Sequence, residues 1–381
     1  MMKKKIVCIL LATLFALAAV GCSKGDSTVS FDDAMPWANL EIGNPNYEYT
    51  EYKIERLYVG GKEDVLVAEG KYTSELDRGG DNTTVKNTFE LTYNDNEYTA
   101  YKNERGDILR NAGLTDRYQS EVTFSNDTLT PLHAQKTQTV AQRPLTDDAM
   151  PDAQLTDLPE GAVARYTLPA QVKYADPRSY AYDADYTADK VHFTTTVGTT
   201  TQDKDNGVYY RDYYEDPKDY TIKNNTRYDN EQLAYVVRAM SECKRKGSGT
   251  FYLSNFYDSY VNDKYVRYKM SLSCADKNTS TTLSLDPAQI VISDAEGKVD
   301  TEDGKYTISC VQASVSISSS TSGPAISLLV TDPSYTIAQT DSQGRCTTKV
   351  VVQMTFTEYS YSSAKVNYRT VYTLTSFRNH R

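Results

Sequence analysis

The chain has 381 residues and a formal net charge of −10, which is enough length for one large β domain or for two to three smaller ones. This acidic balance argues against nucleic-acid binding, because contacts with a phosphate backbone depend on clustered Lys and Arg. It also argues against a body that lies flat on anionic lipid. With 32 Tyr against 9 Phe and 1 Trp, the composition favours strands, whose half-buried faces accept tyrosine rings.

The first segment has the three-part layout of a secretory signal. Lysines at positions 3–5 precede 15 uncharged residues, 6–20, and a helix of that length would span about 22 Å, less than the ~30 Å hydrocarbon core of a bilayer. Ala19-Val20-Gly21 then stands directly before Cys22, and this pattern resembles the lipobox read by bacterial lipoprotein-processing enzymes. The resemblance implies a signal peptide over 1–21 and a diacylglyceryl group on the Cys22 thiol.

The mature chain would then begin with a polar tether, residues 22–37, that carries the lipid. Two acyl chains are sufficient for stable attachment, so we expect the cell membrane as a partner and a location on its extracytoplasmic face. Removal of the lysines at 3–5 lowers the Lys and Arg count from 41 to 38 against 51 acids, a net charge of about −13. The alternative is an ordinary signal peptide in which Cys22 is incidental.

The body of the chain shows the pattern of short strands separated by turns. Apolar and polar residues alternate at 88–93, at 266–274 and at 350–356, the period of two that marks a strand with one buried face. Paired glycines within 58–62 predict a hairpin turn, since they supply positive φ angles. A second hairpin is predicted between 350–356 and the strand at 366–374.

One helix is predicted, at about 229–243. Asp229 can cap its start, and Gln232 stands three residues further on, as in a capping box. A single apolar stripe follows, formed by Leu233, Val236, Val237 and Met240. Because this stripe needs an apolar partner, we expect the helix to cover a β-sheet.

A stretch rich in Pro, Asp and Thr, about 143–161, has no periodicity and predicts a linker or long loop. We therefore expect one all-β domain over 38–381, in two halves of about 38–145 and 162–381, joined by this Pro/Asp-rich segment.

Four cysteines remain beyond the lipid site: Cys243, Cys274, Cys310 and Cys346. An exported location favours disulfides, and four cysteines allow three pairings. Strand alternation places Cys274 and Cys346 among inward-facing residues, so buried free thiols are the alternative. No Cys-x-x-Cys spacing supports a zinc or redox motif.

The sequence contains no recognisable catalytic motif. His133 and His192 lie in Thr-rich, strand-like stretches without a neighbouring nucleophile, which predicts surface positions. Residues 203–207, Asp-Lys-Asp-Asn-Gly, have the alternating acids of a calcium loop, but the glycine comes one position early, so a solvated turn is favoured. We expect no catalytic residue, metal or cofactor, although 51 acids leave a carboxylate-dependent glycosidase open.

The best candidate binding surface lies in 174–229, where ten tyrosines are interleaved with aspartates. Its centre consists of Tyr209, Tyr210, Tyr213, Tyr214, Asp212 and Asp216. Tyrosine rings can stack on sugars while carboxylates accept hydrogen bonds from hydroxyl groups, or both can contact a protein partner. The alternative is a long polar insertion with no ligand.

Three short motifs occur in order along the body: Leu129-Thr130-Pro131-Leu132, Asp229-Asn230-Glu231-Gln232-Leu233 running into Val237-Arg238-Ala239, and Lys305-Tyr306-Thr307-Ile308-Ser309-Cys310. With the signal peptide, they resemble a family of uncharacterised bacterial envelope proteins that carry a β-rich domain of unknown function. The resemblance covers most of residues 45–377. It implies a mainly β fold, a curved antiparallel sheet or half-barrel with one packed amphipathic helix, and it implies no activity.

These expectations lead to three hypotheses about function. The first is an envelope lipoprotein that binds a glycan or a protein without catalysis. The second is an extracellular glycan hydrolase that uses Asp and Glu side chains. The third is a structural or assembly role at the cell surface.

Overall fold

The computed structural model of the protein describes residues 47–95, 100–102, 108–110, 113, 115–140, 158–168, 178–187, 189–205, 207, 209–222, 228–240, 247–255, 266–317, 325–341, 347–359 and 366–380. The expected signal peptide, Cys22 and the tether lie outside these ranges, so they stay predictions.

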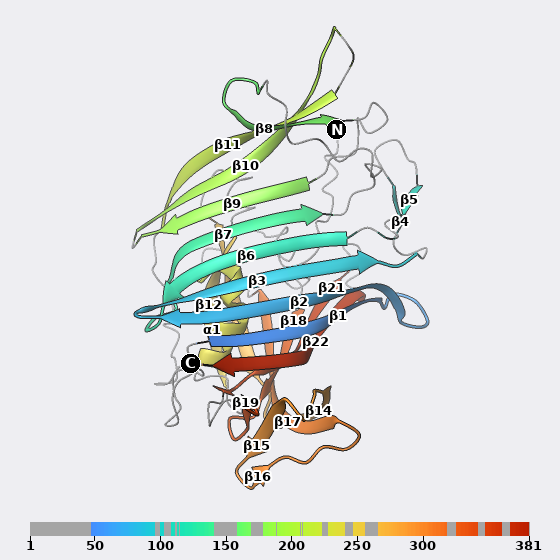
Figure 1. The fold of residues 1–381 in the computed structure, drawn as a ribbon, viewed down its shortest axis with the longest axis vertical. Helices are drawn as coiled ribbons and strands as arrows, with labels where there is room; N and C mark the ends of the chain where they lie inside the picture. The colour runs from blue at the N-terminus through green and yellow to red at the C-terminus, as the bar shows by residue number, and fades with distance from the viewer. Residues whose placement is uncertain are drawn as a thin grey trace.

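A 16-stranded antiparallel sheet dominates the described residues (Figure 1). In the first part of the chain its strands are β1 (Tyr47–Tyr58), β2 (Val65–Gly79), β3 (Asn82–Tyr93), β6 (Thr115–Ser125), β7 (Pro131–Val140), β8 (Ala162–Leu168), β9 (Arg178–Tyr186), β10 (Lys190–Gln202) and β11 (Tyr209–Thr221). In the second part they are β12 (Ser248–Asn255), β13 (Val266–Cys274), β14 (Thr279–Ser284), β17 (Lys305–Ile317), β18 (Ala325–Thr331), β21 (Val351–Tyr359) and β22 (Val366–His380).

Two smaller sheets and a short helical segment complete the described structure. The smaller sheets consist of β15 (Ile290–Asp294), β16 (Gly297–Lys298), β19 (Thr336–Gln339) and β20 (Thr347–Thr348), and of β4 (Ala100–Lys102) and β5 (Ile108–Arg110). The helical segment consists of the 3-10 turn η5 (Asn230–Gln232) and the α-helix α1 (Leu233–Ala239).

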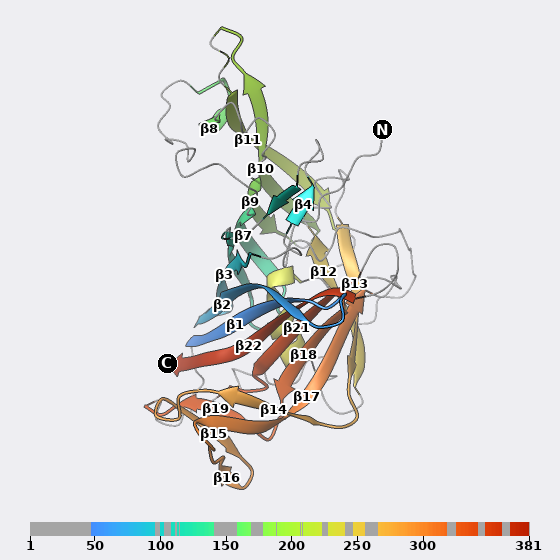
Figure 2. The ribbon, with the colours of Figure 1, turned by 90° about the vertical axis from the view of Figure 1, so that its right-hand side faces the viewer.

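The strand order of the large sheet is β12-β13-β17-β18-β21-β22-β1-β2-β3-β6-β7-β9-β10-β11-β8, and β14 pairs with β17. β22 pairs with β1 from Tyr47↔His380 to Tyr58↔Tyr368, so the last strand lies beside the first. Among the described residues β12 and β8, the two ends of this order, do not pair, and the sheet is open and curved (Figure 2). The predicted fold class, a curved antiparallel sheet with a packed helix, is confirmed.

The period of two in the sequence corresponds to the two faces of this sheet. In β3 buried positions alternate with more exposed ones along the whole strand, and β13 alternates in the same way from Tyr268 to Cys274. Pairing of β1 with β2 and of β21 with β22 confirms both predicted hairpins. The residues on the inner face form one continuous core.

β7 belongs to the first predicted half of the domain and β9 to the second. These two strands pair, so the large sheet is continuous across both halves. Most of the predicted linker, 143–161, lies outside the described residues. The division of the domain into two halves therefore stays a prediction.

Buried tyrosines supply much of the core. The rings of Tyr72 and Phe356 meet the ring of Tyr372 edge to face, with centroids 5.7 and 5.3 Å apart. The Tyr52 hydroxyl donates a hydrogen bond to the Val351 carbonyl at 2.7 Å. Tyrosine combines an apolar ring with a donor at its tip, so it can fill a wide core and still satisfy a buried hydroxyl.

The helical segment packs on the inner face of the sheet (Figure 2). Just before it, the backbone of Tyr228 hydrogen-bonds with Tyr252 and Ser254 of β12. From α1, the Tyr235 hydroxyl lies 2.7 Å from that of Ser74 in β2. The helical segment therefore connects strands that lie far apart in the sheet order.

The predicted capping box is present. The Asp229 carboxylate accepts a hydrogen bond from the Glu231 amide at 3.0 Å, and the Asp229 amide donates to the Gln232 side chain at 2.9 Å. The helix is shorter than the predicted 229–243, since Met240 already has an extended backbone. Residues 241–246 lie outside the described ranges.

A buried ion pair fixes α1 to β1. The Arg238 guanidinium donates to both carboxylate oxygens of Glu48, at 2.6 and 3.0 Å. The two side chains are only 3% and 1% exposed. Loss of one partner would therefore leave the other charge buried without compensation.

Cys310 is a free, buried thiol in β17. Burial raises its pKa to about 12, and the Asp332 carboxylate acts in the same direction. The expectation of disulfides is therefore wrong at this residue, which packs as a small hydrophobe. Cys274 is buried, as alternation predicted, whereas Cys243 and Cys346 lie outside the described residues.

Replacement Glu48→Gln is expected to lower the free energy of unfolding by about 3–5 kcal/mol, because it leaves Arg238 charged and buried. Urea unfolding followed by circular dichroism measures the change. The matched control is Glu121→Gln, whose exposed carboxylate lies 3.3 Å from Lys86. That change is expected to cost about 1 kcal/mol or less. Equal losses in the two variants would contradict the structural role of the buried pair.

Iodoacetamide is expected to leave Cys310 unmodified in the folded protein, because the thiolate is the reactive form and burial suppresses it. In urea without a reductant, Cys310 should react fully. Peptide mapping by mass spectrometry reads out both states. Failure to react in urea until a reductant is added would mean that Cys310 is in a disulfide.

Candidate functional site

β11 carries all six residues of the candidate binding surface and lies near one end of the large sheet, between β10 and β8 (Figure 1). Four of them share one face of the strand, which we call the Tyr–Asp face: Tyr210, Asp212, Tyr214 and Asp216. Tyr209 and Tyr213 occupy positions of the other parity, and their side chains lie outside the described part of the chain.

The Tyr–Asp face combines partly exposed rings with held carboxylates. Tyr210 and Tyr214 are both partly exposed, and the face continues into the core at Tyr220. Asp212, which stands between Tyr210 and Tyr214 along the strand, is buried and accepts a hydrogen bond from the Thr201 hydroxyl at 3.2 Å. Asp216 on the same face is partly exposed. Two partly exposed rings on the same face as the partly exposed Asp216 carboxylate are an arrangement that can orient a polyhydroxylated ligand.

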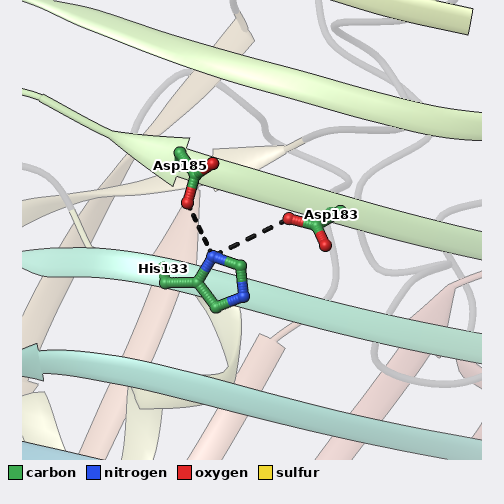
Figure 3. A group of neighbouring side chains, drawn as sticks. All are labelled: His133, Asp183 and Asp185. Carbon is green, nitrogen blue, oxygen red and sulfur yellow. Dashed lines mark hydrogen bonds and ion pairs between the residues drawn. The ribbon is translucent and has the colours of Figure 1, made fainter.

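A second group of polar side chains lies on the opposite, outer face (Figure 3). Nδ1 of His133 in β7 lies 2.7 Å from Asp185 Oδ1 and 3.7 Å from Asp183 Oδ1, both in β9. Their neighbours Ala134 and Ala184 are buried, which places this His–Asp cluster on the solvent side. The side chains of His133, Asp183 and Asp185 are 35%, 47% and 64% exposed.

Strand register extends the cluster across four strands. His133 is opposite Asp185, Asp185 is opposite His192 in β10, and His192 is opposite Asp219 in β11. Nδ1 of His192 lies 2.6 Å from Asp219 Oδ1. The outer face therefore carries a row in which histidines and aspartates alternate.

Sequence reasoning placed both histidines at the surface, as the structure does, but it missed their acidic partners. His133 is 52 residues from Asp185, and His192 is 27 residues from Asp219. Alternation shows only that each of these residues points outward. The partner depends on strand order and register, for which the sequence holds no local signal.

A group of buried charges lies where the helix begins. Lys136 Nζ in β7 lies 2.5 Å from Asp229 Oδ1 and 3.8 Å from Glu231 Oε1. The Tyr118 hydroxyl donates to Glu231 Oε1 at 2.7 Å. All four side chains are buried, so these two convergent carboxylates connect the helix to β6 and β7 within the core.

Burial raises the pKa of Glu231 above its ordinary value. The Asp229 carboxylate adds to this rise, whereas Lys136 and the hydrogen bond from Tyr118 oppose it. Glu231 thus has the raised pKa of a general acid but lies in the packed core, away from solvent.

The acidic segment 203–207 forms the connection between β10 and β11. The Asp203 carboxylate accepts a hydrogen bond from the Asp205 amide at 2.8 Å, and the described side chains of the turn are at least partly exposed. This is the arrangement of a solvated turn, in which an aspartate side chain accepts a hydrogen bond from the backbone amide two residues further along the chain.

Within the described residues, no helix has the length and apolar character needed to cross a membrane.

Folding raises the pKa of Glu231. The contribution of its protonated carboxyl group to the free energy of unfolding is therefore complete below its pKa in the unfolded chain, about 4.3. This contribution is lost as pH rises through the higher pKa of Glu231 in the folded protein. Glu231→Gln does not titrate. We therefore expect the wild type to gain unfolding free energy relative to Glu231→Gln as pH falls from 7 toward about 4.5. Urea unfolding at several pH values measures this difference. The control Glu121→Gln alters an exposed carboxylate instead, and a pH-independent difference for Glu231→Gln would contradict the burial effect.

Comparison with known proteins gives few likenesses. No protein-family model matches the chain, and no curated protein is similar to it. Among solved structures, a beta-barrel-like protein of a domain of unknown function, DUF1849, from Brucella abortus is 8% identical, covering 88% of this chain and 99% of its own, with a TM-score of 0.42. A double mutant of the vaccine antigen Transferrin Binding Protein B from Haemophilus parasuis is 6% identical, covering 93% of this chain and 99% of its own, with a TM-score of 0.10. Neither likeness assigns a ligand or an activity to this chain.

Proposed function

We propose that this protein is a lipid-anchored envelope protein that binds a glycan on the Tyr–Asp face of β11 without catalysis. The observation that carries the proposal is the placement of Tyr210, Tyr214 and Asp216 on one face of β11, all three partly exposed. The anchor and the extracytoplasmic location rest on the lipobox-like sequence that ends at Cys22.

The spacing on β11 suits an extended ligand. Tyr210 and Tyr214 are four residues apart on a strand, which separates them by about 13 Å. Two rings at this distance can stack on two sugar units of one chain, while the partly exposed Asp216 carboxylate accepts hydrogen bonds from hydroxyl groups. A single small ring would contact only one of the tyrosines.

Binding is favoured over hydrolysis by the position of the buried carboxylates. A glycosidase needs two carboxyl groups that flank the scissile bond, one of them with a raised pKa. Glu231 has the raised pKa, but it and Asp229 have their partners inside the core, where the helix begins. The acceptor that the Tyr–Asp face offers to a sugar is Asp216, whose side chain is exposed to solvent.

Purified, untagged protein is expected to bind a member of a panel of glycans and cell-wall fragments. In the double variant Tyr210→Ala/Tyr214→Ala we expect that affinity to fall by about tenfold or more, since well-packed tyrosine anchors contribute about 2 kcal/mol or more. Surface plasmon resonance measures the change. The control is Tyr49→Ala, which removes a partly exposed tyrosine on the distant strand β1. No binding across the panel, or an equal loss with Tyr49→Ala, would contradict a glycan site on β11.

A further inference from the structure

We propose that the His–Asp cluster, His133, Asp183 and Asp185, is a binding site for a divalent transition-metal ion on the outer face of the sheet. One imidazole nitrogen and two carboxylate oxygens from the neighbouring strands β7 and β9 face one another within 4.8 Å (Figure 3). This inference is independent of the glycan site, because the Tyr–Asp face lies on the opposite side of the sheet.

The distances suit a small ion. Ligands bound to Zn²⁺ at about 2.0–2.2 Å in a tetrahedron lie about 3.4 Å from one another. His133 Nδ1 and Asp183 Oδ1 are already 3.7 Å apart. His133 Nδ1 and Asp185 Oδ1, at 2.7 Å, must separate slightly, which the 64% exposed Asp185 side chain can do by rotation about its own bonds.

The charge balance of the cluster also favours a cation. Asp183 and Asp185 lie two residues apart on the same face, where like charges repel. Nδ1 of a neutral histidine carries at most one proton, so it can donate to only one of the two carboxylates. A divalent ion accepts electron pairs from Nδ1 and from both carboxylates at once, and it offsets the repulsion between them.

A neighbouring side chain positions one of the ligands. The Gln135 amide donates to Asp183 Oδ2 at 2.9 Å. This hydrogen bond leaves the other oxygen, Oδ1, directed toward His133. Hydrogen bonds of this kind orient the ligands of metal sites and raise their affinity.

The ligand set selects the class of metal. Imidazole suits Zn²⁺, Cu²⁺ and Ni²⁺, whereas Ca²⁺ and Mg²⁺ prefer sites made of oxygen atoms alone. Three protein ligands on an exposed face leave at least one coordination position for water or for a group from another molecule. The site would therefore hold Zn²⁺ more tightly than Ca²⁺ and present it to solvent.

The row on the outer face supplies a matched control. His192 contacts Asp219 at 2.6 Å, much as His133 contacts Asp185, and it lies on the same face. No second carboxylate completes a group of three ligand atoms around His192 among the described residues. Replacement of His192 thus removes an exposed His–Asp contact without removing a proposed ligand.

Isothermal titration calorimetry of the purified, untagged protein with Zn²⁺ tests the proposal. We expect one Zn²⁺ per chain, and affinity for Ca²⁺ lower by about tenfold or more. His133→Gln and Asp185→Asn should each weaken Zn²⁺ binding by about tenfold or more, and His192→Gln should change it by about twofold or less.

Three results would overturn this site. The first is the absence of Zn²⁺ binding to the wild type. The second is Zn²⁺ binding that persists unchanged in His133→Gln, which would place the ion elsewhere, for instance on a cysteine. The third is an equal loss in His192→Gln. Circular dichroism of each variant checks that the sheet is intact.

Discussion

Pairing of the first described strand with the last is the interaction on which the rest of the structure depends. β1 and β22 run side by side from Tyr47↔His380 to Tyr58↔Tyr368. Strands that follow β1 in sequence extend the sheet on one side of this pair, and β21, β18 and β17 extend it on the other. Without the pairing, the sheet would divide into two, each with an unpaired edge open to aggregation.

A curved sheet of this size leaves an inner face that must be covered, and the short helical segment does so with polar as well as apolar contacts. Glu48 binds Arg238 at one end of the segment, and Lys136 binds Asp229 at the other. Such buried ion pairs gain little net stability, since desolvation offsets most of their attraction. They do favour a single position for the helix, because any shift along the sheet would leave buried charges without partners.

The two faces of the sheet carry different groups of side chains, on different strands. The inner side carries the Tyr–Asp face on β11, next to the tyrosine-rich core. The outer side carries the His–Asp cluster on β7 and β9, where solvent has direct access. Because side chains alternate along a strand, β11 carries Tyr210 and Tyr214 on the inner face and Asp219, which contacts His192, on the outer face.

Local features of this protein were readable from the sequence alone. Alternation of apolar and polar residues at 88–93 and 266–274 predicted strands with one buried face, as the structure has them. Asp229 and Gln232 predicted the start of the helix. Both signals depend only on residues within a few positions of one another. Strand order was decided only by tertiary structure, as were the meeting of His133 with Asp183 and Asp185 and the free thiol of Cys310. The physical reason is that register between distant strands depends on how whole faces pack, which no short stretch of sequence encodes.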